Sequence, residues 1–430
     1  MMDCDKDFYK EFKTIRNKIS SFRKDQIVII CFEYMKKLWS LNLIDINTKE
    51  LPLPWHLLLI FKWGLVYGAN KIEGKPFNQK EFGEIYSKLI ELPSNTKWLN
   101  SQDNLGIWRF LRATFSAQYP FQKNNGIYGL CVTDIIFKDI GINFDCDMIL
   151  NKILGLTLED YLSFQFLIAA IYLSNDDWPS YNIDNFRTFS KYTDLKKLQN
   201  FLNYYSAGFN QVETFMINHH NIVNNPEFEY NLISPLYKIP FYKFNAKYLA
   251  YHKTLINQFI GYGLYDLLKS YYPDDFSGSF GVGFENYLDY PLSRLNLKYL
   301  RDKEIRKTYS ISASVDFLFN FLDDTLLIEA KSSEISELIS NKPEYRFLEL
   351  YFQNSLVKGY KQLFRTAFEL TKQNPSIFKN KTFWGIIVTY KDSILGSPEL
   401  IWEEFMSQKM KEELAQEIFE ASLLNHLRIF

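Results

Sequence analysis

The chain has 430 residues, of which 47% are hydrophobic and 17% aromatic, so it has enough apolar material for two or three packed domains. Its 18 glycines and 14 prolines are few for this length, which argues against a disordered or linker-rich protein. The formal net charge is −1, so no global basic excess indicates a polyanion partner, and any nucleic-acid surface has to be a local basic patch.

The cysteines and the N-terminal stretch indicate a reducing compartment. The 4 cysteines are widely separated and form no Cys-x-x-Cys pair, which also argues against a structural zinc site. The first residues, MMDCDKDFYKEFKTIRNK, are charged where a signal peptide needs an apolar stretch. Apolar runs such as 56–61 and 166–173 are far shorter than the ~20 residues that span a bilayer. We therefore expect a cytoplasmic protein without a membrane segment.

Residues 1–225 are predicted to be mainly helical. Apolar residues recur at steps of three and four from Phe8 to about Leu41, and again over 80–92, 103–117 and 158–173. LPLPWH (51–56) and WPSYN (178–182) predict breaks. We expect a helical N-terminal domain over 1–225.

The pattern changes near residue 226. The stretch 236–253 alternates β-forming residues around Asn245-Ala246, which predicts a hairpin, and a helix is expected over 254–270. GSFGVG (278–283) is expected to be a flexible loop that leads into a helix containing Glu285.

Two strands are expected next, over 312–321 and 325–331. A helix over 354–373 and the apolar strand FWGIIVTY (383–390) follow, and Ser397-Pro398-Glu399 predicts the start of a last helix. Together these elements predict a mixed α/β domain over 226–430.

Three charged side chains lie inside the two expected strands: Asp316, Glu329 and Lys331. A two-residue turn at Asp323-Asp324 places apolar pairs on one face, and it gathers the charges at one end of the other face, with Asp316 opposite Lys331. Asp-Asp is a weaker hairpin signal than Asp-Gly or Asn-Gly, so a longer loop with the same register is an alternative.

This grouping predicts a metal site. Two carboxylates about 7 Å apart repel each other, and Lys331 or a divalent metal can supply the compensating charge. Oxygen ligands suit Mg²⁺ or Mn²⁺, with water and substrate phosphate completing the shell. A carboxylate-held metal beside a lysine is an arrangement for phosphodiester hydrolysis. The alternative is a structural ion pair between Asp316 and Lys331, although a pair of this kind is seldom net stabilising when buried.

Asp316, a 12-residue spacer and then Glu329-Ala330-Lys331 after an apolar strand resemble the PD-(D/E)xK nuclease superfamily. The resemblance covers about 280–390, although Val315 precedes the aspartate where the family's name has proline. It implies an α+β multidomain protein, in which the helical N-terminal domain precedes a restriction-endonuclease-like α/β domain with a mixed central sheet.

The resemblance also implies site residues. Asp316, Glu329 and the carbonyl of Ala330 would hold Mg²⁺ or Mn²⁺, and Lys331 would position or deprotonate the attacking water. Glu285, in the helix before the strands, is implied as a further acid. In the helix after them, Gln362 and Lys361 are implied as polar residues that face the site.

Basic residues beside the expected site predict phosphate contacts. The stretch 294–307 holds six basic and two acidic residues, a net charge of 6 − 2 = +4, and Lys358, Lys361 and Arg365 of the helix expected over 354–373 extend the basic character. The predicted nucleic-acid-binding residues are Arg294, Lys298, Arg301, Lys358, Lys361 and Arg365. A solvated helix face is the alternative for each of them.

The resemblance therefore predicts a metal-dependent nuclease, with DNA favoured over RNA, that acts in defence against phage or foreign DNA and self-associates as a homodimer. The helical domain is expected to be a sensor, a partner surface or a DNA clamp. The alternatives are a catalytically silent nucleic-acid-binding module and a partner-binding regulator. His56, His219, His220, His252 and His426 lack metal-ligand spacing and are expected to be packing or surface residues.

Overall fold

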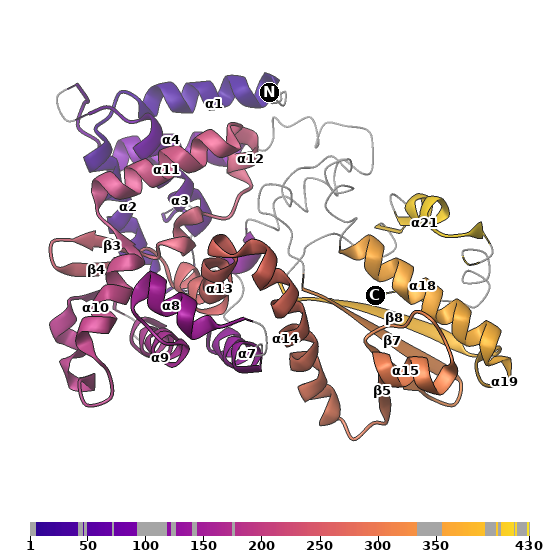
Figure 1. The fold of residues 1–430 in the computed structure, drawn as a ribbon. Coiled ribbons are helices and arrows are strands. Elements are labelled where there is room, and N and C mark those ends of the chain that lie inside the picture. The colour runs from indigo at the N-terminus through magenta and orange to yellow at the C-terminus, as the bar shows by residue number, and fades with distance from the viewer. Residues whose placement is uncertain are drawn as a thin grey trace. The chain divides into compact units, whose positions relative to one another are not determined.

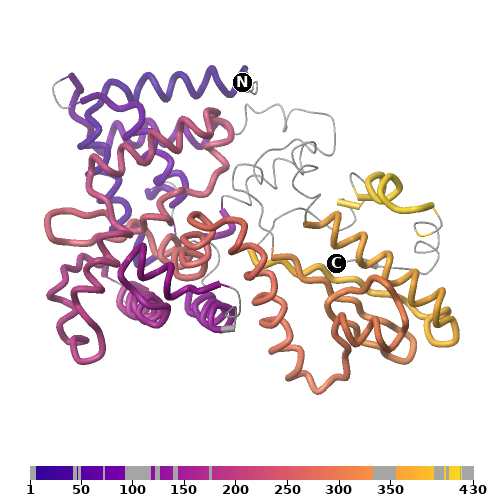
Figure 2. The backbone as a smooth tube through the Cα atoms, viewed as in Figure 1, coloured from indigo at the N-terminus to yellow at the C-terminus, as the bar shows by residue number. Residues whose placement is uncertain are grey.

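The computed structural model describes residues 6–41, 46, 50–70, 73–92, 118–121, 126–139, 144–173, 177–332, 355–391, 401–402, 406–416, 418 and 428–429. The chain divides into two compact units (Figures 1 and 2). The first comprises Met1–Asp134 and Asp145–Tyr271, and the second comprises Ile135–Phe144 and Tyr272–Phe430. This division differs from the expected boundary at 225/226. The helix expected over 103–117 and the expected start of the last helix at Ser397-Pro398-Glu399 lie outside the described residues.

Helices dominate the first unit, as the apolar periodicity predicted. Its N-terminal helices are α1 (Lys6–Ile19), α2 (Lys24–Leu38), α3 (Pro54–Tyr67) and α4 (Gln79–Glu91). Then follow α7 (Gly126–Asp139, whose end belongs to the second unit), α8 (Cys146–Leu154), α9 (Leu158–Ile168), α10 (Leu195–Tyr204), α11 (Phe209–Val223), α12 (Pro226–Tyr230) and α13 (Lys253–Tyr271). Pro54 at the first turn starts α3 inside the expected break, and the helix is buried on nearly all sides.

A small sheet belongs to the same unit. Its strands are β1 (Ser180–Tyr181), β2 (Ser206–Ala207), β3 (Phe241–Phe244) and β4 (Lys247–Ala250), in the order β1-β4-β3-β2. The predicted hairpin is confirmed, because Phe244 pairs with Lys247 around Asn245, whose φ of 55° lies in the left-handed region that asparagine tolerates. The stretch 178–182, expected only as a break, contains β1.

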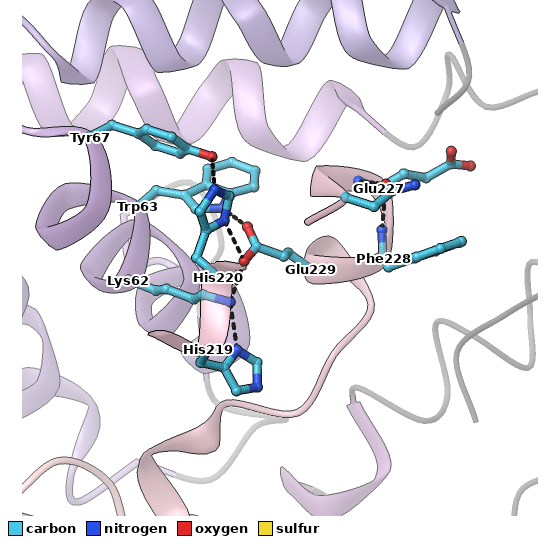
Figure 3. A network of polar contacts seen from close by, with 9 residues as sticks. Lys62, Trp63, Tyr67, His219, His220, Glu227, Phe228 and Glu229 are labelled. Carbon is cyan, nitrogen blue, oxygen red and sulfur yellow. Dashed lines mark hydrogen bonds and ion pairs between the residues drawn. The ribbon is translucent and has the colours of Figure 1, made fainter. Parts of the chain in front are cut away.

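A buried polar network joins α3, α11 and α12 of the first unit (Figure 3). Both carboxylate oxygens of Glu229 are bonded: Oε1 contacts Lys62 Nζ and lies 2.9 Å from His220 Nδ1, and Oε2 accepts from Trp63 Nε1 at 2.8 Å. The expectation that His220 is a packing residue is thus too weak, because its ring joins Glu229 to Tyr67, whose hydroxyl lies 3.1 Å from Nε2.

Among the described residues, no single helix has the length and apolar character needed to cross a membrane. One pair, Cys146–Leu154 with Leu158–Leu173, meets that test jointly but is bent by 67°.

The second unit contains a five-stranded mixed sheet in the order β5-β6-β7-β8-β9. Its strands are β5 (Tyr299–Arg301), β6 (Phe317–Asn320), β7 (Asp324–Lys331), β8 (Thr382–Thr389) and β9 (Arg428–Ile429). The first three strands pair antiparallel, whereas β8 pairs parallel to both β7 and β9. Helices α14 (Pro273–Ser293), α15 (Asp302–Tyr309), α18 (Leu356–Gln373), α19 (Pro375–Phe378) and α21 (Ser407–Glu413) complete the described elements.

The sheet is covered on both faces. Leu318 and Leu327 pack with Leu363 of α18, while Phe317 and Ile328 pack with Leu292 of α14. Both faces of the hairpin are apolar except at the end that carries Asp316, Glu329 and Lys331, so the charges gather at one end of one face, as expected. This mixed α+β architecture confirms the coarser part of the predicted fold.

Two local expectations are wrong. The glycines of 278–283 lie inside α14 rather than in a loop, because the helix already begins at Pro273 with Asp274 and Asp275 in its first turn. The hairpin turns at Leu322-Asp323, not Asp323-Asp324, so Phe317 pairs with Ile328 instead of Ala330. A turn one residue earlier moves every partner by two positions and leaves each side chain on its expected face.

Candidate active site

The sheet and its neighbouring helices bring the predicted acids together. Asp316 immediately precedes β6, and Glu329 and Lys331 lie at the C-terminal end of β7. Extending the observed register places Asp316 across from Glu329, not from Lys331 as the expected turn required. Two like charges directly opposite destabilise a strand pair, so this end of the hairpin needs a cation.

Hydrogen bonds orient these side chains. The amide N–H of Ala330 donates to Asp316 Oδ2 at 2.7 Å, and Lys331 Nζ pairs with Glu329 Oε1. Glu329 is only 1% exposed, and its second oxygen, Oε2, is buried without a hydrogen-bond partner in the described part of the chain. A buried carboxylate oxygen without a partner is costly, which marks this position as one that a bound cation would satisfy.

The shifted pKa values report the same crowding of negative charge. Burial, and then the charge of Asp316, raise the pKa of Glu329 to about 8 against the opposing effect of Lys331. Burial likewise raises the pKa of Asp316, although the Ala330 N–H and Lys331 oppose the shift. In α14, burial and then Asp316 raise the pKa of Glu285 to about 7. Glu285 therefore belongs to the same electrostatic cluster.

The donors fit Mg²⁺ or Mn²⁺ in one specific way. Across the described residues, no group of three or more His, Cys, Asp and Glu side chains has the geometry of a metal site. Mg²⁺ is usually held by one or two carboxylates, with waters and substrate phosphates completing the shell. Asp316 and Glu329, with the unpartnered Oε2, match that donor set, and the Ala330 carbonyl is the further oxygen that the sequence implied.

Gln362 lies near the site but bonds to the backbone. Its Nε2 donates to the carbonyl of Ser314 at 2.8 Å, two residues before Asp316. The Ser314 hydroxyl donates to Asp302, whose N–H donates to the Asp316 carbonyl at 3.1 Å. Gln362 therefore contacts the backbone of the segment that leads to Asp316.

The predicted basic residues are not equivalent. Arg301 is half-buried: its guanidinium lies 3.2 Å from Asn286 Oδ1 and 3.5 Å from Asp289 Oδ2. Its positive charge partly opposes the upward shift in the pKa of Glu285. Lys361, expected as a polar residue that faces the site, pairs with Glu413 Oε2 of α21 at 2.7 Å. Lys298, Lys358, Arg365 and Arg294 are exposed, and Arg294 stacks on Tyr290.

Sequence reasoning missed Asp302 and Ser314 as supports. A serine and an aspartate 12 residues apart, in a stretch whose strand β5 and helix α15 were not expected, carry no motif. Only the capping pattern of α15, in which Glu304 accepts from the Arg301 N–H at 3.0 Å, offered a signal that a helix begins there.

Comparison with known proteins adds no assignment. No protein-family model matches the chain, and neither a curated protein nor a solved structure resembles it significantly.

Proposed function

We propose that the second unit is a metal-dependent nuclease with a restriction-endonuclease-like fold, acting on DNA in preference to RNA. The observation that carries the proposal is the half-buried Asp316 opposite the buried Glu329, with Lys331 beside them and a carboxylate oxygen of Glu329 that has no hydrogen-bond partner among the described residues. The order α14-β5-α15-β6-β7-α18-α19-β8 supports it, because the aspartate precedes the second strand of this sheet and Glu-x-Lys ends the third.

Each residue has a distinct role in this proposal. Asp316 and Glu329 hold the cation, which when bound supplies Lewis-acid polarisation of the phosphate and a more acidic water. The Lys331 ammonium orients the attacking water and stabilises the charge that develops on the phosphate. Glu285, whose pKa of about 7 lets it exchange protons near neutrality, accepts or returns a proton at the edge of the site.

The exposed basic side chains are proposed to contact the nucleic-acid backbone. Arg294, Lys298, Lys358 and Arg365 would provide affinity that does not depend on sequence. The paired Lys361 and the half-buried Arg301 are weaker candidates, because each already contacts acidic or polar groups of the protein.

Cleavage assays test the proposal. Linear DNA, circular DNA and RNA are incubated with the full chain and Mg²⁺ or Mn²⁺, and circular DNA reports whether the ends are needed. Asp316→Ala and Lys331→Ala are each expected to lower the rate at least a hundredfold. The control is Asp323→Asn at the opposite end of the same hairpin, which should leave the rate unchanged. Cleavage that survives both site changes would refute the assignment, and a chain that binds DNA without cleaving it under any metal would favour the silent module.

The wider context follows as a proposal of its own. A defence role predicts that bacteria expressing the wild-type chain resist phage infection and that the Asp316→Ala variant does not. Equal plaque counts with both chains would contradict it. Sedimentation of the full chain with and without DNA tests the expected homodimer.

A further inference from the structure

In the part of the chain that the structure describes, the loop that leads to Asp316 pairs with no strand. It runs from Ser310, whose φ of 57° ends α15 in the left-handed region, to Val315 just before Asp316. β6 begins only at Phe317, so no sheet ladder fixes these residues. The position of the Asp316 carboxylate therefore depends on the Ala330 N–H, which donates to Oδ2, and on how this loop is held. Ile311 and Val315 are buried in the core, and polar contacts hold the residues between them.

Glu369 of α18 holds it through both carboxylate oxygens. Oε2 accepts from the N–H of Ser312 at 2.6 Å and from the N–H of Ala313 at 3.4 Å, and Oε1 accepts from the Ser312 hydroxyl at 2.7 Å. Hydrogen bonds to an ionised acceptor are shorter and stronger than neutral ones. Glu369 is thus an anchor for the middle of the loop.

Helix α18 is a rigid base for this anchor. Glu369 lies seven residues, about two turns, after Gln362, so the two side chains share one helix face and contact successive parts of the same loop. Leu363, Ala367 and Leu370 of α18 are fully buried in the cluster that contains Leu318 and Leu327. The sheet therefore fixes the helix, and the helix fixes the loop.

We propose that Glu369 is a positioning residue for the Asp316 carboxylate, acting through the Ser310–Val315 loop. Among the described residues, the hydrogen bonds of the Glu369 carboxylate go to Ser312 and Ala313 of this loop. Its bonds lie near the surface, so their loss should cost the fold little while allowing the loop to move. This inference rests on the proposed function, because its measurable consequence is cation affinity at Asp316 and Glu329.

The test compares Glu369→Gln with the wild-type chain. Glutamine keeps the size of the side chain but has a single acceptor oxygen, so it cannot serve all three donors. Hydrogen exchange should accelerate at the Ser312 and Ala313 amides. The dissociation constant for Mn²⁺, measured by calorimetry without substrate, should rise about tenfold, as is typical when a supporting partner of a metal ligand is removed. In cleavage, kcat should fall while KM for DNA stays unchanged.

Controls separate positioning from general destabilisation. Glu412→Gln makes the same change at an exposed position of α21 and should alter neither exchange in the loop nor Mn²⁺ affinity. Ser312→Ala removes only the hydroxyl contact, provides a milder variant, and should add nothing when combined with Glu369→Gln.

The outcomes are distinguishable. Unchanged exchange at Ser312 and Ala313, or faster exchange with wild-type Mn²⁺ affinity, would overturn the positioning role. A wild-type chain that binds no Mn²⁺ would overturn the proposed function instead, and the exchange comparison would still decide whether Glu369 anchors the loop.

Discussion

Changing Glu329 to glutamine should stabilise the metal-free protein, and the sign of this change separates a functional site from a structural ion pair. A structural pair of Glu329 with Lys331 would make the charge favourable, so its removal would destabilise the fold. Instead, Glu329 is buried with Asp316 across the strand pair, and its pKa is raised to about 8. The ionised form is therefore penalised in the folded state.

The magnitude follows from proton linkage. The pKa is about 8 in the folded state against an ordinary value of 4.5, so between these pH values the folded state binds more protons and stability falls as pH rises. The cost is about 3 kcal/mol at pH 7 and about 1 kcal/mol at pH 5. Because Glu329→Gln also removes the partner of Lys331, we expect a net gain of about 2 kcal/mol at pH 7, or roughly 4–8 °C in Tm.

The assay is thermal unfolding in EDTA at pH 5 and pH 7, with the wild type, Glu329→Gln and the control Glu413→Gln. Glu413 pairs with Lys361 in the same unit, but both side chains are about a quarter exposed, so its loss should shift stability by under about 1 kcal/mol. The gain for Glu329→Gln should be larger at pH 7 than at pH 5. A loss of stability at both pH values would refute the reasoning and favour the structural pair.

Three further predictions concern the first unit. Lys62→Met should destabilise it by about 3–5 kcal/mol in urea unfolding, because Glu229 is left buried without its ammonium partner, whereas Asp184→Asn, in an exposed pair, should cost under about 1 kcal/mol. Burial lowers the pKa of His56 to about 4, so the unfolded chain binds the proton first as the pH falls below 6.5. The free energy of unfolding should therefore fall by about 3 kcal/mol between pH 6.5 and pH 4, and His56→Gln should remove most of this pH dependence. Gly129→Ala should lower the free energy of unfolding in urea by about 1–3 kcal/mol, because the added Cβ would lie 2.9 Å from the backbone of α13.

Local patterns predicted much of the secondary structure. The hairpin around Asn245 and the helices over 254–270 and 354–373 form where apolar spacing and turn residues placed them. The charged residues of the candidate site could also be identified from the sequence, because Asp316, Glu329 and Lys331 interrupt apolar strands, where charged side chains are rare unless they are paired or functional. Patterns of this kind depend on a few neighbouring residues, so a single sequence is enough to recognise them.

The register of the site hairpin could not be read in the same way. Moving the turn from Asp323-Asp324 to Leu322-Asp323 changes the partner of Asp316 from Lys331 to Glu329, yet it keeps every side chain on its face. Hydrophobic alternation has a period of two and cannot distinguish registers that differ by two. The partner of Asp316 therefore depended on turn chemistry, which was the weakest signal.

The supports of the site were out of reach for a different reason. Gln362 and Glu369 bond to residues 48 and 57 positions away in the chain, and neither forms a motif with its partner. The glycines of 278–283, expected to form a loop, lie in helix α14 instead. Tertiary packing favours the helix there, because Phe280 and Phe284, which lie among and directly after these glycines, are buried. Long-range contacts of this kind become visible only once the fold is known.

The bond between Lys62 and Glu229 has a consequence for how the protein is made. The two residues lie 167 positions apart, so α3 leaves the ribosome long before the carboxylate that neutralises its lysine has been translated. The strands β3 and β4 follow later still. A nascent chain that stops near residue 225 would expose an unsatisfied lysine on an otherwise apolar helix, which is a surface that chaperones bind. The N-terminal half therefore matures late in synthesis, even though it is translated first.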